Sequence, residues 1–329
     1  MQIAGIHCFW ELLSKSTPQN HCQDKTSGDA PYQHTCFEIR GIALANLIFE
    51  VCCRFRYILR VTENSPKRKM LGKNLIMLMQ LSLAFSLLAQ ERPKSNFLID
   101  AGGVIRTDPA KRTIHLVFTG HEFADGGYSI RSTLAKHSIK ASFFFTGDFY
   151  RNPDFSDLIR SLKTDGHYLG AHSDEHLLYC TWEKRDSLLV TKEEFWKDLL
   201  DNYEAMTPFG ISRHEAPYFM PPYEWYNDSI SAWTRELGFT LVNFTPGTYS
   251  NADWTHPELG KQYLSSDTIF ARILRYEAGR PNGLNGFLLL THIGTDPRRK
   301  DKFYFKLDQL IDVLTRKGYR FALLNESIR

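Results

Sequence analysis

Cysteine is scarce in most of this 329-residue sequence. Cys180 is the only cysteine after residue 70, and the other five lie before that point. A single cysteine has no disulfide partner within residues 71–329, so a fold held together by disulfides is excluded for the larger C-terminal part.

A charge excess of either sign is also missing, because 40 Lys and Arg residues face 37 Asp and Glu residues. The densest basic cluster is residues 67–69, which is too short for the basic surface that binds nucleic acid. The sequence therefore predicts no nucleic-acid partner. Its 43% hydrophobic and 23% charged residues indicate a globular chain rather than a disordered one.

Long apolar runs are absent as well, and the run at residues 75–88 is too short for a stable membrane span. It follows basic residues and ends in a small residue, Ala89, which is the layout of a secretory signal peptide. We expect residues 70–89 to be the signal, with cleavage near Ala89 and a secreted or periplasmic product. Residues 1–69 are then expected to be a non-native or unstructured extension that precedes a start at Met70, although a pro-segment is the alternative.

Residues 90–329 are expected to form one catalytic domain. Short β-rich segments alternate there with segments of helical period, which is typical of βα units around a parallel sheet. The predicted strands are residues 114–119, 141–146, 168–172, 218–220, 240–245, 286–292 and 320–324. The predicted helices are residues 130–137, 155–164, 191–207, 228–237, 266–278 and 303–316. Seven such units in one α/β domain predict a distorted (β/α)7 barrel, whose chemistry gathers where the strands end.

Two histidines four residues apart follow the third predicted strand. His172 and His176 would face the same way on a helical turn and could bind one metal ion from two sides. The signal is weak by itself, because a chain with 12 histidines contains roughly 0.4 such pairs by chance. A pair of surface histidines is the competing interpretation.

Ionisable side chains also follow two apolar strands. His121 and Glu122 come after the run at 116–120, and His292 ends the run at 286–291. Such groups are costly to bury without a partner, so a metal or a catalytic role is favoured at strand ends. The alternatives are a solvated loop for the first pair and a satisfied core histidine for His292.

Taken in chain order, these features resemble the NodB-type polysaccharide deacetylases, which are carbohydrate esterase family 4. The resemblance covers about residues 114–324. It is carried by the segments TGHE at 119–122, ASFFFTG at 141–147, HSDEH at 172–176, FMPPYEWYN at 219–227 and GFLLLTHIG at 286–294.

The resemblance assigns roles to the first two ionisable motifs. It implies that His172 and His176 are metal ligands, that Glu122 is the third ligand and that His121 stands at the position of the general base, which is an aspartate in the family. Asp125 is an alternative ligand or base, and a solvated turn is its simpler interpretation.

The resemblance also makes His292 the general acid and the backbone N–H of Tyr223 the donor that stabilises the oxyanion. The sequence departs from the family at two further positions, one beside the base and one beside the acid. Met220 stands where the family has an arginine that braces the base, and Ser250 stands where it has the aspartate that orients the acid histidine. We expect Asp253 to take over that orienting role.

Aromatic residues close to these motifs predict a sugar-stacking groove, with Tyr218, Trp225 and Trp254 as its candidates, although each could instead belong to the core. The resemblance implies hydrolysis of N- or O-linked acetyl groups on a polysaccharide or glycan. The implied cofactor is a divalent metal ion, with zinc first and cobalt, nickel or manganese as alternatives. An inactive carbohydrate-binding homologue, or a metal hydrolase of another amide or ester, is the rival hypothesis.

Overall fold

The central strand is β3 (Thr113–Gly120), which is buried along its whole length in the computed structural model. It pairs in parallel with β4 (Ser142–Phe145) on one side and with β8 (Phe287–His292) on the other. All three strands are apolar runs rather than alternating ones, as expected of a parallel sheet that is covered on both faces. The structure describes residues 96–328, so the predicted extension at 1–69 and the predicted signal at 70–89 lie outside the described residues.

The sheet continues in parallel from β4 to β5 (Tyr168–Ala171), β6 (Tyr218–Phe219) and β7 (Thr240–Leu241). Every predicted strand therefore has a counterpart, although most are shorter than expected. The seventh, β9 (Arg320–Phe321), pairs only with the first two residues of β3 and lies off the main path of the sheet.

An antiparallel hairpin that the sequence analysis did not predict completes the sheet. It consists of β1 (Leu98–Asp100) and β2 (Gly103–Arg106), and β2 pairs with β8 at the sheet's edge. On its other side, β2 meets the chain after β7 through a bridge between Val104 and Val242, and the N–H of Asn243 donates to the Val104 carbonyl at 2.9 Å. The curled sheet is thus closed weakly, and the predicted distorted barrel is confirmed.

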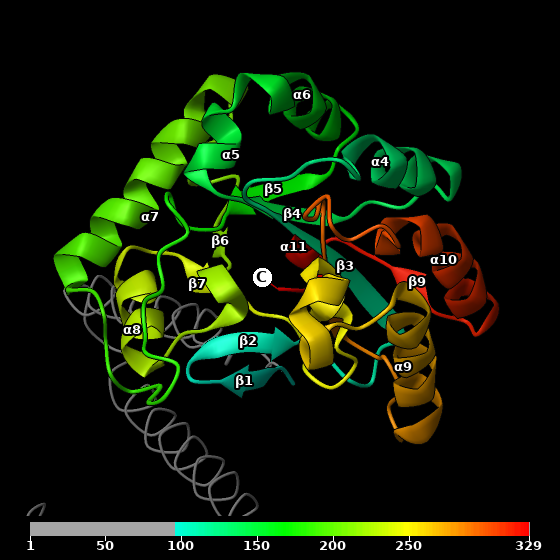
Figure 1. Cartoon of the computed structure of the whole chain (residues 1–329). Helices are drawn as coiled ribbons and strands as arrows, with labels where there is room; N and C mark the ends of the chain where they lie inside the picture. Colours follow the sequence, from blue (N-terminus) through cyan, green and yellow to red (C-terminus); the bar gives the residue numbers. More distant parts are fainter. Residues whose placement is uncertain (1–95, 329) are drawn as a thin grey trace, which may run out of the picture. The chain divides into compact units, whose positions relative to one another are not determined.

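Helices surround this sheet, as Figure 1 shows. The α-helices are α4 (Gly127–Lys136), α5 (Gly147–Arg151), α6 (Ser156–Thr164), α7 (Lys192–Met206), α8 (Asp228–Glu236), α9 (Ser266–Gly279), α10 (Leu307–Arg316) and α11 (Leu324–Ser327). The 3-10 helices are η1 (Pro153–Phe155), η2 (Thr207–Phe209), η3 (Pro222–Glu224), η4 (Ser250–Trp254), η5 (Pro257–Gln262) and η6 (Phe303–Lys306).

The observed helices differ from the predicted ones in three places. The short helices α5 and α11 were not predicted, because five and four residues are too few to show a helical period. The predicted helix at 303–316 is divided into η6 and α10. The other five predicted helices are confirmed within a few residues at each end.

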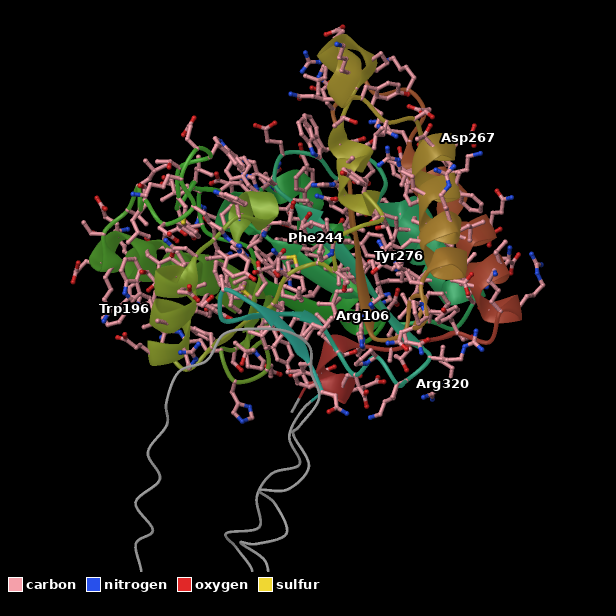
Figure 2. All side chains as sticks on the ribbon, turned by 90° about the horizontal axis from the view of Figure 1, so that it is seen from below. Arg106, Trp196, Phe244, Asp267, Tyr276 and Arg320 are labelled. Carbon is pink, nitrogen blue, oxygen red and sulfur yellow. The ribbon has the colours of Figure 1, made fainter. Side chains whose placement is uncertain are left out.

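The carboxyl ends of the parallel strands meet at one end of the barrel, where η4 and η5 rise above the sheet. In Figure 2 these yellow turns stand at one end of the molecule and Arg320, at the start of β9, lies near the opposite end. Within residues 96–328, no helix is long and apolar enough to cross a membrane.

Candidate active site

A cavity of about 540 Å³, which we call the histidine cavity, opens where the parallel strands end. Seven of the residues singled out in the sequence contribute to its wall. They are His121, Glu122, His172, His176, Tyr223, Trp254 and His292. The curled parallel sheet thus brings together motifs that are up to 171 residues apart in the chain.

His172 follows β5 directly and is almost fully buried. Its Nδ1 lies 2.9 Å from the carbonyl oxygen of Met220, which can only accept, so Nδ1 carries the proton. The lone pair of Nε2 is therefore free. Burial lowers the pKa of His172 to about 3, with smaller contributions from the neighbouring His292 and His121. The imidazole is neutral at physiological pH, as a metal ligand must be.

The chain between His172 and His176 is not helical, which corrects the predicted helical turn. Ser173 and His176 both have left-handed backbones, with φ of 77° and 58°. The two imidazoles still lie close, with ring centroids 5.1 Å apart. Burial, reinforced by the positive charges that His172 and His121 would carry, lowers the pKa of His176 to about 2.

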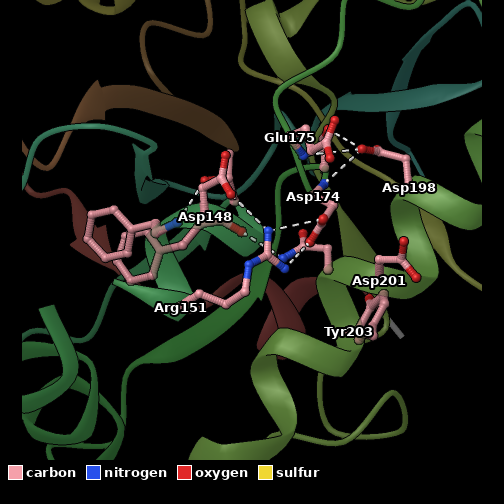
Figure 3. Close-up of polar contacts among 12 residues, drawn as sticks. Asp148, Arg151, Asp174, Glu175, Asp198, Asp201 and Tyr203 are labelled. Atoms are coloured by element: carbon pink, nitrogen blue, oxygen red, sulfur yellow. Dashed lines mark hydrogen bonds and ion pairs between the residues drawn. The ribbon is translucent and has the colours of Figure 1, made fainter. Parts of the chain in front are cut away.

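A buried carboxylate holds this unusual turn in place. Asp198 on α7 accepts hydrogen bonds from the Ser173 hydroxyl and from the next two backbone N–H groups at 3.1–3.2 Å, and its other oxygen accepts from the Tyr179 hydroxyl at 2.5 Å. Arg151 of α5 pairs with Asp174 at 2.7 Å from the other side. Figure 3 shows Asp198 and Arg151 reaching the turn from different helices.

Replacing Asp198 with alanine is expected to lower the free energy of unfolding by about 2–4 kcal/mol, because several buried donors lose their acceptor together. Urea denaturation measures this change. The matched control is Asp201→Ala on the same helix, because Asp201 pairs only with the exposed Lys197 and should cost about 0.5 kcal/mol or less. Equal and small losses in both variants would show that the turn does not depend on Asp198.

His292, at the end of β8, is paired with a buried aspartate. Its Nδ1 lies 2.6 Å from Oδ1 of Asp253, and its backbone N–H donates to Oδ2 of the same carboxylate at 3.0 Å. Burial by itself would lower the pKa of His292, but the charge and hydrogen bond of Asp253 and the charge of Glu224 outweigh it and raise the pKa. Ser250 does not reach His292, and its buried hydroxyl has no partner within the described residues.

His121 and Glu122 are placed differently from their predicted roles. The ring of His121 stacks on that of His176, with centroids 4.7 Å apart, and its Nδ1 lies 3.1 Å from the Thr146 hydroxyl. Glu122 is exposed at the rim. No three His, Cys, Asp or Glu side chains among residues 96–328 are already arranged to hold a metal ion. The predicted ligand set of Glu122, His172 and His176 is therefore not assembled, and His121 is the first-motif residue that lies against the histidine pair.

Asp125 does not join the histidine cavity, which corrects its prediction as a ligand or base. One carboxylate oxygen accepts the N–H of Thr295 at 2.8 Å. The other lies 2.9 Å from Lys302 Nζ and accepts the Tyr304 hydroxyl at 2.9 Å. Asp125 thus fastens the loop after β3 to the loop after β8.

The predicted aromatic groove needs correction at two positions. Tyr218 is buried under the sheet, where its hydroxyl donates to the Ile328 carbonyl at 2.5 Å. Trp225 is partly buried and stands behind Trp182, with ring centroids 5.8 Å apart. Trp254 does line the cavity, and so does Trp182, which sequence reasoning missed because it belongs to no motif. These two indoles are 47% and 54% exposed, so they are available to stack on a ligand.

Glu224 is a second cavity residue that the sequence analysis did not single out. It follows Tyr223 in η3, and both residues have left-handed backbones, with φ of 53° and 57°. Such strain costs on the order of 1 kcal/mol per residue and is concentrated at functional sites. Burial raises the pKa of the Glu224 carboxyl. The only sequence signal was its place beside Tyr223 in the PPYE segment.

Comparisons with known proteins agree with this geometry. Residues 107–242 match the family model described as polysaccharide deacetylase. Among curated relatives, the peptidoglycan-N-acetylmuramic acid deacetylase PdaA of Bacillus subtilis is 24% identical over 66% of this chain and 71% of its own length. A chitin deacetylase of Arthroderma benhamiae is 25% identical over 70% of this chain and 55% of its own.

Solved structures show the same fold. A family 4 carbohydrate esterase pseudoenzyme from Bacillus anthracis aligns with a TM-score of 0.55 at 18% identity, over 70% of each chain. The structure of Bacillus subtilis PdaA aligns with a TM-score of 0.54 at 20% identity, over 69% of this chain and 85% of that one. Residues 107–242 are thus similar to the polysaccharide deacetylase family, and the chain shares its fold with solved family 4 carbohydrate esterases.

Proposed function

We propose that this protein is a metal-dependent hydrolase that removes acetyl groups from a polysaccharide. The observation that carries the proposal is the histidine cavity itself, in which an aspartate-paired histidine faces two neutral histidines. Histidine pKa values shifted in opposite directions in one cavity suit a metal site beside a general acid. The relatives named as peptidoglycan and chitin deacetylases support acetylated polysaccharides as the substrate class.

Three neighbouring imidazoles are donors of the type that zinc prefers, although among residues 96–328 they are not arranged around one point. The side chains of His121, His172 and His176 would hold the ion, since their rings adjoin one another and neutral imidazoles are common zinc ligands. The hydrogen bond from His172 to the Met220 carbonyl is the kind of outer contact that orients a ligating histidine. A bound ion, with zinc first and cobalt, nickel or manganese as alternatives, would polarise the acetyl carbonyl and activate water.

The remaining roles follow from position. His292 would donate a proton from Nε2 to the departing amine or alkoxide, because Asp253 occupies its Nδ1. The backbone N–H of Tyr223 is the candidate donor to the oxyanion. Since His121 lies against His176, we reassign the base role to Glu122, the other ionisable residue of the first motif on the cavity wall.

Acetate release from acetylated glycans tests this proposal. The purified protein, supplied with zinc, should release acetate from at least one substrate in a panel of N-acetylated chito-oligosaccharides, peptidoglycan fragments and O-acetylated xylan. The panel also separates amide from ester substrates. A protein that is folded and zinc-loaded but releases no acetate from any of them would rule out deacetylation of these glycans.

One observation favours a carbohydrate-binding protein without catalysis as the second candidate. The rings of His121 and His176 are stacked, with an angle of 10° between their planes. Among residues 96–328, no three possible metal ligands are arranged to hold an ion. Such a protein would bind oligosaccharide between Trp182 and Trp254 and would release no acetate. Calorimetric titration with the same oligosaccharides, with and without zinc, distinguishes the two candidates.

We also propose that the protein is exported, with cleavage near Ala89. Support comes from the sequence alone, since residues 67–91 contain the basic start, apolar run and small residue of a signal peptide. Mass spectrometry of the protein from its native cell would find a mature N-terminus close to Gln90. Peptides from residues 1–66 in the mature protein would contradict the proposal.

A further inference from the structure

The η3 turn places a glutamate in a backbone conformation that glycine adopts without strain. Tyr223 and Glu224 are consecutive residues with φ of 57° and 53°. L-residues with larger side chains are disfavoured there because Cβ crowds the neighbouring carbonyl oxygen. A glycine at position 224 would remove the strain at that residue, so the glutamate side chain needs another explanation.

Three hydrogen bonds maintain this conformation. The N–H of Glu224 donates to the Pro221 carbonyl at 3.1 Å, and that of Trp225 donates to Pro222 at 3.2 Å. The side-chain amide of Asn243 donates to the carbonyl of Glu224 at 2.8 Å. Strained residues persist only where their surroundings determine the backbone in this way. The turn therefore sets the direction of the Glu224 side chain.

That direction brings the side chain to the wall of the histidine cavity, which Asn251 and His292 also line. Glu224 comes from the turn after β6 and lines the cavity with His292, whereas Asp253 comes from η4 after β7 and contacts His292 directly. A partly buried carboxyl group is costly unless it interacts with a positive charge or a ligand. Arg298 also lines the cavity, but it pairs with Asp296, and the charge of Glu224 favours the imidazolium of His292.

We propose that Glu224 is a positioning residue for His292, and that its carboxylate and that of Asp253 hold this imidazole from two sides as the proton donor. Asp253 fixes the ring through Nδ1, and Glu224 acts from the cavity side, where the substrate must lie. The catalytic consequence rests on the proposed function, whereas the interaction between the two side chains does not.

Other charged groups around His292 act against Glu224 and Asp253. The buried guanidinium of Arg299 disfavours a positive charge on His292. His172 and His176 would do the same if they were protonated, but both are neutral at physiological pH. The charge of Glu224 therefore adds to that of Asp253 against the positive charge of Arg299.

The test uses two substitutions that differ in their effect on the backbone. Glu224→Gln removes the charge and keeps both the length of the side chain and the left-handed backbone. Glu224→Gly removes the charge and the backbone strain together. In both variants we expect the pKa of His292, followed by NMR of labelled imidazoles in metal-free and zinc-loaded protein, to fall by about one pH unit. On an acetylated oligosaccharide, kcat above neutral pH should fall about tenfold while KM stays within about twofold.

Ser138→Gly is the matched control, because Ser138 also has a left-handed backbone, with φ of 54°, and lies exposed after α4. Both glycine variants should raise the melting temperature, and only Glu224→Gly should change His292. A Glu224→Gly protein that is more stable and has an unchanged His292 pKa would overturn the inference and leave Glu224 a structural residue. If the wild type released no acetate but the His292 pKa still fell in both variants, the proposed function would fail and the positioning of His292 would stand.

Discussion

Replacing His172 with alanine is expected to lower acetate release by about a thousandfold. His172 is the most enclosed of the three candidate ligands, and its ring is fixed by the 2.9 Å hydrogen bond to the Met220 carbonyl. Its loss removes one donor and leaves that carbonyl without its partner. A metal ion stabilises a hydrolytic transition state by several kcal/mol, and each 1.4 kcal/mol corresponds to a factor of ten in rate.

Bound metal and rate should therefore be measured together. Treatment of the wild type with a chelator should give the same loss, and added zinc should restore the wild type but not His172→Ala. His214→Ala is the control, because His214 is exposed and lies outside the histidine cavity. A rate that survives both chelation and His172→Ala would refute a metal-dependent mechanism.

Asp253→Asn is expected to lower kcat by about a hundredfold or more at alkaline pH, since positioned acid catalysis contributes roughly 10²–10⁴ in rate. Asp253 raises the pKa of His292 in the wild type, so His292 keeps its proton above its ordinary range. The asparagine variant loses the charge that favours the imidazolium. The alkaline limb of its pH–rate profile should therefore shift to lower pH.

The free energy of unfolding should also depend on pH in the range where His292 titrates. Because the pKa of His292 is raised in the folded state, the stability it contributes is fully present below the unfolded pKa of about 6.5 and is lost as pH rises through the folded pKa. Asp253→Asn should weaken this dependence in urea titrations between pH 6 and pH 9, because Glu224 still favours the imidazolium. Asp267→Asn, at the 83% exposed position near the start of α9, is the control, and identical pH profiles for the two variants would show that Asp253 does not act on His292.

The sequence was informative about the fold because periodicity is a local property. The strands that became β3, β4, β5 and β8 are continuous apolar runs, and such runs indicate strands buried on both faces. The β1–β2 hairpin was missed, since each strand has only three or four residues and β2 pairs with β8, far along the chain. Its role in closing the barrel is a tertiary contact between Val104 and Val242.

Some residues of the candidate site could also be found from the sequence, and others only from the fold. Strand ends identified His121, His172 and His292, because parallel strands bring their carboxyl ends together. Sequence could not choose between His121 and Glu122, since adjacent residues point in different directions and only the packing against His176 places His121 inside. Asp198 and Glu224 carried no local pattern, and their roles depend on contacts made across the fold.

The sequence by itself thus determined the resemblance to the family, the barrel of βα units and the set of motifs at its carboxyl end. Only the tertiary structure decided which residue of the first motif, His121, packs against the histidine pair. It also showed that Asp253, and not Ser250, contacts His292. It alone showed that the histidine pair lies on a left-handed turn held by Asp198. The physical reason is that periodicity and propensity arise from neighbours in the chain, whereas side-chain direction, burial and charge pairing arise from residues that only folding brings together.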